Sequence, residues 1–234
     1  MKLRVLVALA ALVLMVAGCT DNGILKVTNT SDGVVVISIN SGSLITLLSQ
    51  YFHTQSWKLK KSIFNTEEKT VNLSYTGYYV FTNSQNLKVT AGKTKSYNIE
   101  ADAGVIQIKN NCPYNITHVY ISPSSSPYWG DNQLSSILPP GAINEWMATP
   151  GTWDVKVRDA SGYEGSSFYN QVNLNETILL IYTHKGSKTA DPAGGQFTFS
   201  PNPDLEKQQS AASLGIKPSE GRIEEHRSRE LYSR

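Results

Sequence analysis

The sequence predicts an all-β protein. Its short apolar runs are rich in Val, Ile, Thr and Tyr, and Tyr alone contributes 12 of the 234 residues; these side chains favour strands. Gly, Pro, Asn and Ser separate the runs, and no long window keeps the apolar spacing of a helix over three turns. Short strands at such spacing are typical of β-sandwiches.

The first element that the sequence predicts is a secretion signal over residues 1–18. Lys2 and Arg4 form a short positive region, and an uninterrupted apolar run follows over 5–17. The run is too short for a comfortable transmembrane helix and has the layout of a signal peptide. We therefore expect a protein that works outside the cytoplasm.

Residues 16–19 (VAGC) resemble the lipobox of bacterial lipoproteins. The resemblance implies cleavage before Cys19 and acylation of Cys19, which would tether the chain to a membrane of the cell envelope. Thr20 stands where an aspartate favours retention in the inner membrane, so the resemblance implies the outer membrane if the host has two membranes. Residues 19–22 would then form a short lipidated stalk.

An internal repeat divides most of the remaining chain into two modules, at 23–101 and 104–184. Each copy opens with glycine and a strand that stops at asparagine, Asn29 in the first copy and Asn110 in the second. The matched segments are 23–29 with 104–110, 34–40 with 116–122, 71–81 with 145–155, and 87–90 with 172–175. The order of these segments predicts two tandem β-sandwich modules.

The clearest single strand of the second module covers residues 153–158. Apolar Trp153, Val155 and Val157 alternate there with three charged residues. A period of two places the apolar side chains on one face of the sheet and the charges on the other. In the first module, the run 44–48 fits either a strand or a short helix.

The second module carries Trp-Gly at 129–130, Pro-Pro-Gly at 139–141 and the run PGTWDVKVRD at 150–159. This pattern resembles a small immunoglobulin-like β-sandwich repeat of secreted bacterial proteins, well over 104–184 and weakly over the first module. The resemblance implies a fold but no activity, because these positions fit turns and core. Such modules are usually binding or spacer units, and a fold does not fix a function.

The last segment, 185–234, has a different composition. Pro, Gly, Ser, Gln and charged residues dominate it, which predicts a disordered, flexible tail. Within the tail, 196–200 alternates and fits an added edge strand, and 223–232 fits a short helix supported by pairs of residues four apart.

The charge balance excludes a nucleic-acid partner. The formal net charge of +2 comes from Lys2 and Arg4, so the chain from Cys19 onward has 19 basic and 19 acidic side chains. A neutral chain has no electrostatic footprint for nucleic acid. It also predicts no polybasic patch for anionic lipid, which leaves the acyl chains on Cys19 as the link to the membrane.

No segment carries a catalytic signature, so we predict a protein that is not an enzyme and that uses no cofactor or metal. The histidines are His53, His118, His184 and His226. They lie far apart in sequence, and neither HExxH nor GxSxG occurs. Cys112 is the only cysteine besides Cys19, which fits a small buried residue and excludes a disulfide within the mature chain if Cys19 is acylated.

Aromatic residues crowd the second module and supply the candidate binding residues Tyr128, Trp129 and Trp146. If several were exposed together, they could form a stacking platform for a sugar or a hot spot for a protein. The alternative is that the tryptophans fill the sandwich core. The loop 122–129 is the best candidate binding loop, because loops on a rigid sandwich carry function.

Three functional hypotheses remain open at this point. The first is a membrane-anchored envelope lipoprotein that acts as a non-enzymatic binding or scaffolding module for a protein or glycan. The second is a carbohydrate-binding accessory protein, which requires that Trp129, Trp146 and Trp153 are not all buried. The third is a periplasmic assembly partner that donates residues 197–199 to the edge of another sheet.

Overall fold

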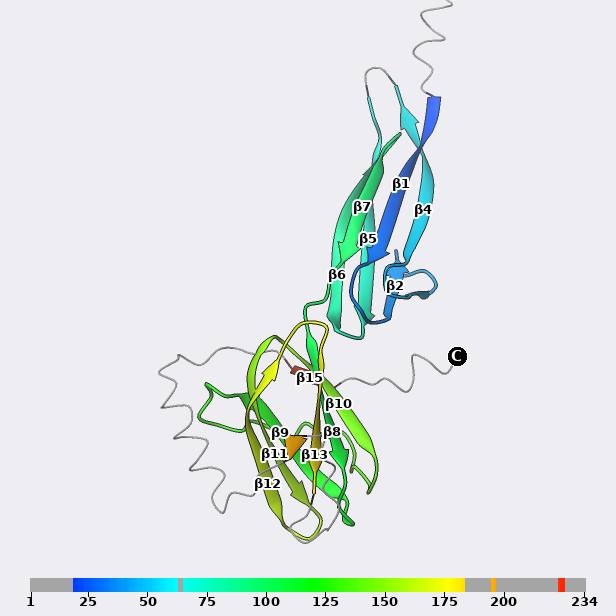
Figure 1. Cartoon of the computed structure of the whole chain (residues 1–234). Helices are drawn as coiled ribbons and strands as arrows, with labels where there is room; N and C mark the ends of the chain where they lie inside the picture. The colour runs from blue at the N-terminus through cyan, green and yellow to red at the C-terminus, as the bar shows by residue number, and fades with distance from the viewer. Residues whose placement is uncertain (1–18, 63–64, 184–194, 197–222, 226–234) are drawn as a thin grey trace, which may run out of the picture. The chain divides into compact units, whose positions relative to one another are not determined.

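The computed structural model describes residues 19–62, 65–183, 195–196 and 223–225, and these ranges contain strands and no helix. The chain divides into two compact units, and the boundary in the sequence falls between Glu100 and Ala101 (Figure 1). Each unit is a β-sandwich, which confirms the predicted all-β fold with two tandem sandwich modules. The predicted signal peptide and most of the predicted flexible tail lie outside the described residues.

Unit 1 forms two sheets from the strands of its described residues. These are β1 (Cys19–Asn29), β2 (Val35–Ile39), β3 (Ile45–Leu47), β4 (Phe52–Lys61), β5 (Glu68–Gly77), β6 (Val80–Thr90) and β7 (Thr94–Ile99). One sheet has the order β4-β1-β7 and the other has the order β3-β2-β5-β6. The run 44–48 therefore contains a short strand. β1 is antiparallel to β4 and parallel to β7, so the first and last strands are neighbours.

Unit 2 repeats this arrangement. Its main strands are β8 (Gly104–Asn110), β9 (Ile116–Pro123), β10 (Ile143–Ala148), β11 (Gly151–Asp159), β12 (Glu164–Val172) and β13 (Thr177–Tyr182). β8 is antiparallel to β10 and parallel to β13, as β1 is to β4 and β7. The second sheet has the order β12-β11-β9. In place of β3, a single bridge joins Leu138 to Ile116.

The strand pairing confirms the repeat but corrects one part of the predicted alignment. β1 and β2 correspond to β8 and β9, as the sequence indicates. The match of 71–81 with 145–155 is wrong by one strand, because β5 lies between β2 and β6 as β11 lies between β9 and β12. Both segments consist of a strand, a glycine turn and a second strand, and this local pattern does not show which sheet each strand joins.

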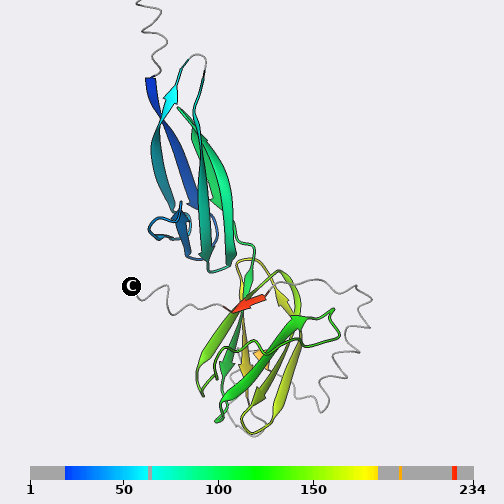
Figure 2. The same cartoon turned by 180° about the vertical axis from the view of Figure 1, so that it is seen from behind.

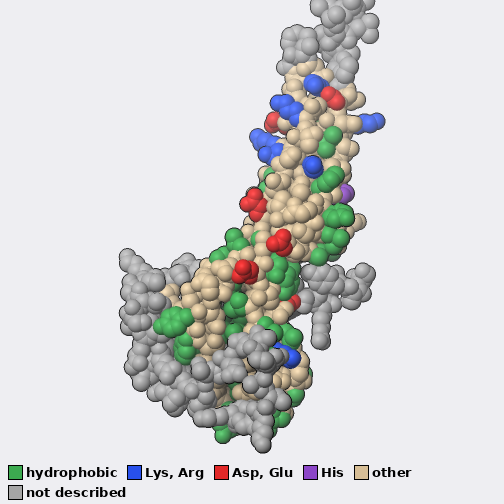
Figure 3. Space-filling view, viewed as in Figure 1, with side chains coloured by type: hydrophobic (Ala, Val, Ile, Leu, Met, Phe, Trp, Pro, Cys, Tyr) green, Lys and Arg blue, Asp and Glu red, His purple; other side chains and the backbone are tan. Residues whose placement is uncertain are grey.

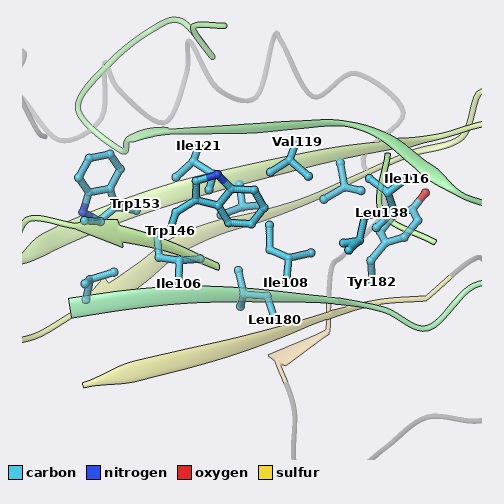
Figure 4. Close-up of a cluster of buried hydrophobic side chains, with 14 of the residues drawn as sticks. Ile106, Ile108, Ile116, Val119, Ile121, Leu138, Trp146, Trp153, Leu180 and Tyr182 are labelled. Carbon is cyan, nitrogen blue, oxygen red and sulfur yellow. The ribbon is translucent and has the colours of Figure 1, made fainter. Parts of the chain in front are cut away.

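The core of each unit lies between its two sheets. In unit 1, Leu25 and Val27 of β1 pack in one buried cluster with Leu73 of β5. In unit 2, the corresponding cluster surrounds Trp146, and Figure 4 shows its ring among side chains of both sheets. The neighbouring core residues include Ile106, Ile108, Ile121, Trp153 and Leu180. Alternation along the strands therefore supplies both cores, as the period of two predicts.

The asparagine that ends the first strand of each unit has a structural role. In unit 2 the Asn110 amide donates to the carbonyl oxygens of Tyr114 and Leu138, and its Oδ1 accepts from the Cys112 backbone N–H. In unit 1 the Asn29 amide makes the matching bonds. It donates to the carbonyl oxygens of Gly33 and Leu47, and its Oδ1 accepts from the Ser31 backbone N–H. Both asparagines are fully buried, so each satisfies polar backbone groups at one end of its core.

Two segments of the tail add strands to unit 2. β14 (Gly195–Gln196) pairs in parallel with β13, and β15 (Ile223–Glu225) pairs antiparallel with β10. The sheet therefore reads β14-β13-β8-β10-β15, and Figure 2 shows β15 in red beside β10. The predicted edge strand is seen at Gln196, while 197–200 lies outside the described residues. The helix predicted from 223 is wrong at 223–225, where β10 offers an open edge that binds extended backbone.

Candidate functional site

Cys19 is the first residue of β1. Its backbone pairs with Lys61, and Thr20 pairs with Lys60. The predicted stalk at 19–22 is therefore wrong, because these residues are hydrogen-bonded to β4 as the first part of a strand. An acyl group on Cys19 would thus be attached to the sheet itself. Among the described residues, no helix is long and apolar enough to cross a bilayer.

Trp146 is a core residue and not an exposed binding residue. Its side chain has no exposed surface, and the indole Nε1 donates to the carbonyl oxygen of Gln133 at 3.2 Å. Trp153 is also buried, and its Nε1 donates to the carbonyl oxygen of Thr149 at 2.9 Å. The prediction that Trp146 contacts a ligand is therefore wrong, because β10 directs this side chain between the two sheets.

Trp129 is buried on the other side of the sheet β12-β11-β9. It lies in the connection between β9 and β10 and is only 7% exposed. Its ring centroid is 5.8 Å from that of Phe168 and 5.3 Å from the ammonium nitrogen of Lys156. Trp129 therefore covers the outer face of this sheet, and it is not presented to a ligand.

Two of the three charged residues on the outer face of β11 are buried under this connection, which the alternating pattern alone does not indicate; Arg158 stays exposed. Asp154 is 0% exposed and Lys156 is 7% exposed. Asp154 Oδ1 accepts hydrogen bonds from the Ser124 hydroxyl and, at 2.8 Å, from the backbone N–H of Tyr169. The Lys156 ammonium also lies 4.9 Å from the Tyr120 ring, a favourable cation–π distance. The hydrogen bond from Ser124 to Asp154 and the contact of Lys156 with the Trp129 ring hold the loop over the sheet.

Tyr128 is the one exposed member of the three aromatic candidates. Its side chain is 73% exposed, and the Ser126 hydroxyl bonds to both its backbone carbonyl and its backbone N–H. The structure therefore does not bring Tyr128, Trp129 and Trp146 together as an open platform. With Trp129, Trp146 and Trp153 all buried, the condition for the carbohydrate-binding hypothesis is not met.

A buried polar cluster at one end of the unit 2 core contains Cys112, Asp159 and Tyr182. Tyr182 donates to Asp159 Oδ2 at 3.1 Å, and Cys112 Sγ donates to Asn110 Oδ1 at 3.0 Å. Burial raises the pKa of Tyr182, and the nearby Asp159 carboxylate raises it further. Burial also raises the pKa of the Cys112 thiol. A thiol that stays protonated is a poor nucleophile, so this cluster serves the fold.

The structure also places seven lysines at the end of unit 1 where β1 begins, and sequence analysis missed this group. Figure 3 shows lysines gathered at this end. We name the group the lysine collar; it comprises Lys58, Lys60, Lys61, Lys69, Lys88, Lys93 and Lys95. The prediction that the chain has no polybasic patch is therefore wrong, because a net charge of zero averages over distant parts of the chain. The sequence signals were WKLKK at 57–61 and GKTK at 92–95.

Comparisons with known proteins leave the function open. No protein-family model and no curated protein sequence matches the chain. Among solved structures, the Bacillus anthracis TIE protein is 10% identical at a TM-score of 0.27, over 70% of this chain and 33% of that one. This chain thus spans about one third of that chain's length. The tip fimbrial protein Mfa3 from Porphyromonas gingivalis, with C-terminal truncation, is 9% identical at a TM-score of 0.27, over 89% of this chain and 98% of that one.

The described residues contain no group of three or more His, Cys, Asp or Glu side chains placed to hold a metal ion. Three fully buried polar residues, Asn29, Asn110 and Asp154, bond to backbone or to loop residues of their own unit. Their geometry holds loops against sheets. The surfaces left for contact with other molecules are the exposed loops, the sheet edges and the lysine collar.

Proposed function

We propose that this chain is an envelope lipoprotein, anchored by acyl chains on Cys19, that acts as a non-enzymatic binding or scaffolding module. The observation that carries the proposal is the position of Cys19. The residue that the lipobox motif marks for acylation is also the residue at which β1 begins. Cleavage before Cys19 would leave both sandwiches whole and would attach them directly to the lipid.

The test of the anchor is the mass of the mature protein. The full chain is expressed in a bacterium that processes lipoproteins, and membranes and soluble fraction are analysed by intact mass spectrometry. We expect a chain that starts at Cys19 and carries added diacylglyceryl and acyl mass. Cys19→Ala should abolish the added mass, whereas the matched Cys112→Ala should retain it. A wild-type chain without added lipid mass would refute the anchor.

A second candidate role, in assembly, is favoured by β14 and β15. These short tail segments occupy both edges of the sheet β13-β8-β10, and edge pairing is a general way to bind extended peptides. A partner's strand could replace a tail segment at either edge. The same tail could in turn add to the edge of another sheet.

Supplying the tail separately tests this role. Residues 185–234 are fused to a carrier protein and mixed with the full chain or with a chain that ends at 184. We expect the carrier to bind the shortened chain, whose edges are open, and to bind the full chain much less. Failure to bind the shortened chain, with its folding verified by circular dichroism, would exclude strand addition by the tail.

A further inference from the structure

The lysine collar lies beside Cys19. The backbone partners of Cys19, Thr20 and Asn22 are Lys61, Lys60 and Lys58. At about 3.4 Å per residue, these three lysines lie within roughly 10 Å of Cys19 along the strand, which is about one Debye length at physiological salt. Each is exposed.

The turn before β7 brings further lysines to the same end. The backbone N–H of Ile24 donates to the carbonyl oxygen of Lys93 at 2.9 Å, and Lys95 pairs with Leu25 in the parallel ladder. Both lysines are exposed. Because β7 lies on the opposite side of β1 from β4, lysines flank β1 on two sides: those of β4 beside residues 19–22, and those of the β7 side beside residues 24–25.

The collar keeps a positive charge after its local ion pairs are counted. Three carboxylates share this end of the unit, Asp21, Glu67 and Glu68, so seven lysines leave a formal charge of +4. Asp21 pairs with Lys61 at 3.3 Å, and Glu68 lies 3.9 Å from Lys88. Within the described residues, no ion pair occupies the ammonium groups of Lys58, Lys60, Lys93 and Lys95.

The rest of the described chain has the opposite charge. The other two carboxylates of unit 1, Asp32 and Glu100, follow β1 and β7 at the far end of the unit. Residues 101–183 carry three lysines and arginines against seven carboxylates. Positive charge is therefore concentrated at the end that carries Cys19, where an acylated cysteine would place it against a bilayer.

We propose that the lysine collar binds the headgroups of anionic phospholipids in the membrane that holds Cys19. This inference deepens the proposed anchoring function and rests on it for the position of the membrane. The acyl chains fix the start of β1 at the surface, so the lysines meet headgroups at high effective concentration. The collar adds electrostatic attraction to the acyl anchor and sets how unit 1 stands on the surface.

Vesicle binding by the chain without its acyl group tests the proposal. Residues 19–234 with Cys19→Ser are sedimented with phosphatidylcholine vesicles, with or without one third phosphatidylglycerol. Each lysine near an anionic surface favours binding by about fivefold, so we expect preferential sedimentation with the anionic vesicles. The preference should fall when salt rises from about 0.05 M to about 0.5 M, because the Debye length shortens.

A charge-matched pair of variants separates the collar from net charge. Replacing Lys58, Lys60, Lys93 and Lys95 by Gln should lower the partition coefficient on anionic vesicles at least about tenfold. The control replaces four tail lysines by Gln and changes the net charge equally; these are Lys185, Lys188, Lys207 and Lys217. The control should bind like the parent chain. Two double variants, Lys58/Lys60 and Lys93/Lys95, serve if the quadruple variant does not fold.

Three results would overturn the proposal. They are equal binding to neutral and anionic vesicles, equal losses in the collar and tail variants, and binding to dextran sulfate without binding to anionic vesicles. The last result would indicate a soluble polyanion as the partner. The vesicle experiment uses a chain without an acyl group, so its result does not depend on whether Cys19 is acylated. A failure of vesicle binding and a failure of acylation can therefore be distinguished.

Discussion

At the residue scale, Asn29 and Asn110 occupy equivalent positions in the two units and make equivalent hydrogen bonds. Each uses one amide to bond two backbone carbonyl oxygens and one backbone N–H. Ser31 and Cys112 occupy equivalent places, and each side chain also donates to the asparagine Oδ1. Cys112 is thus the counterpart of Ser31 in the other copy.

We predict that Asn110→Ala destabilises unit 2 by at least about 2 kcal/mol, because it leaves buried backbone groups without partners. Urea unfolding followed by tryptophan fluorescence measures this change. Asn173→Ala is the control, since Asn173 is exposed, and it should change the free energy of unfolding by less than about 0.5 kcal/mol. Equal effects of the two substitutions would contradict the role given to Asn110.

The raised pKa of Tyr182 predicts that the folded protein loses stability at alkaline pH. Its raised pKa means that the folded chain keeps the phenolic proton where the unfolded chain releases it. Its contribution is therefore complete below the ordinary tyrosine pKa of about 10 and decreases as pH rises above that value.

We expect Tyr182→Phe to lower the free energy of unfolding at pH 8, because the bond to Asp159 is lost, and to flatten its decline above pH 10. Urea titrations at several alkaline pH values provide the measurement. Tyr51→Phe, at an exposed position, should follow the wild-type slope. A Tyr182→Phe slope as steep as that of wild type would argue against this assignment.

The residue scale also shows where sequence reasoning reaches its limit. Alternation correctly places Trp153, Val155 and Val157 in the core. It places Asp154 and Lys156 on the opposite face but cannot show that this face is covered, because the covering residue, Trp129, comes from a separate connection. Burial of a charge by a distant loop is a tertiary effect without a local pattern.

At the scale of elements, composition and turn residues were enough to predict the strands and the repeat. They were not enough to assign 71–81 to its counterpart, because neighbouring strand–turn–strand segments share the same pattern. The short strand β15 was also missed, since the helical pairing of charges is a weak preference beside the hydrogen bonds of an open sheet edge.

We predict that Glu224→Pro disrupts the pairing of β15 with β10, because proline removes a backbone donor and fits poorly in a paired strand. Hydrogen exchange should then become faster within residues 146–148, at those N–H groups that point to β15 and not to β8. The exposed edge should also raise self-association, measured by sedimentation velocity. Glu230→Pro is the matched control, and equal exchange in both variants would rule out this pairing in solution.

At the scale of the whole molecule, two cores in one chain imply two separable stabilities. Each unit has its own buried cluster and its own pair of sheets. The sequence predicts this division, since the repeat is long and ordered. The composition does not reveal how charge is distributed along the chain. An excess of positive charge in one part and an excess of negative charge in another cancel in the net charge.

We predict that Asn29→Ala lowers the urea midpoint of unit 1 and leaves that of unit 2 unchanged within error. The measurement is hydrogen exchange across a urea series. Exchange in peptides from β5 reports the unfolding of unit 1, and exchange in peptides from β11 reports the unfolding of unit 2. Asn98→Ala, at an exposed site in unit 1, should shift neither midpoint. If Asn29→Ala lowered the urea midpoints of both units by the same amount, the two cores would be coupled and this prediction would be wrong.

The parallel pairing of first and last strands has a mechanical consequence. In unit 1 residues 24–29 run beside 94–99, and in unit 2 residues 105–110 run beside 177–182. A pull between the two ends of either unit drags these neighbours in opposite directions along their length. Tension then loads the whole ladder in shear, where an antiparallel hairpin would unzip one bond at a time. Survival under force depends on the unfolding rate, and in this geometry the hydrogen bonds of the ladder resist the force together.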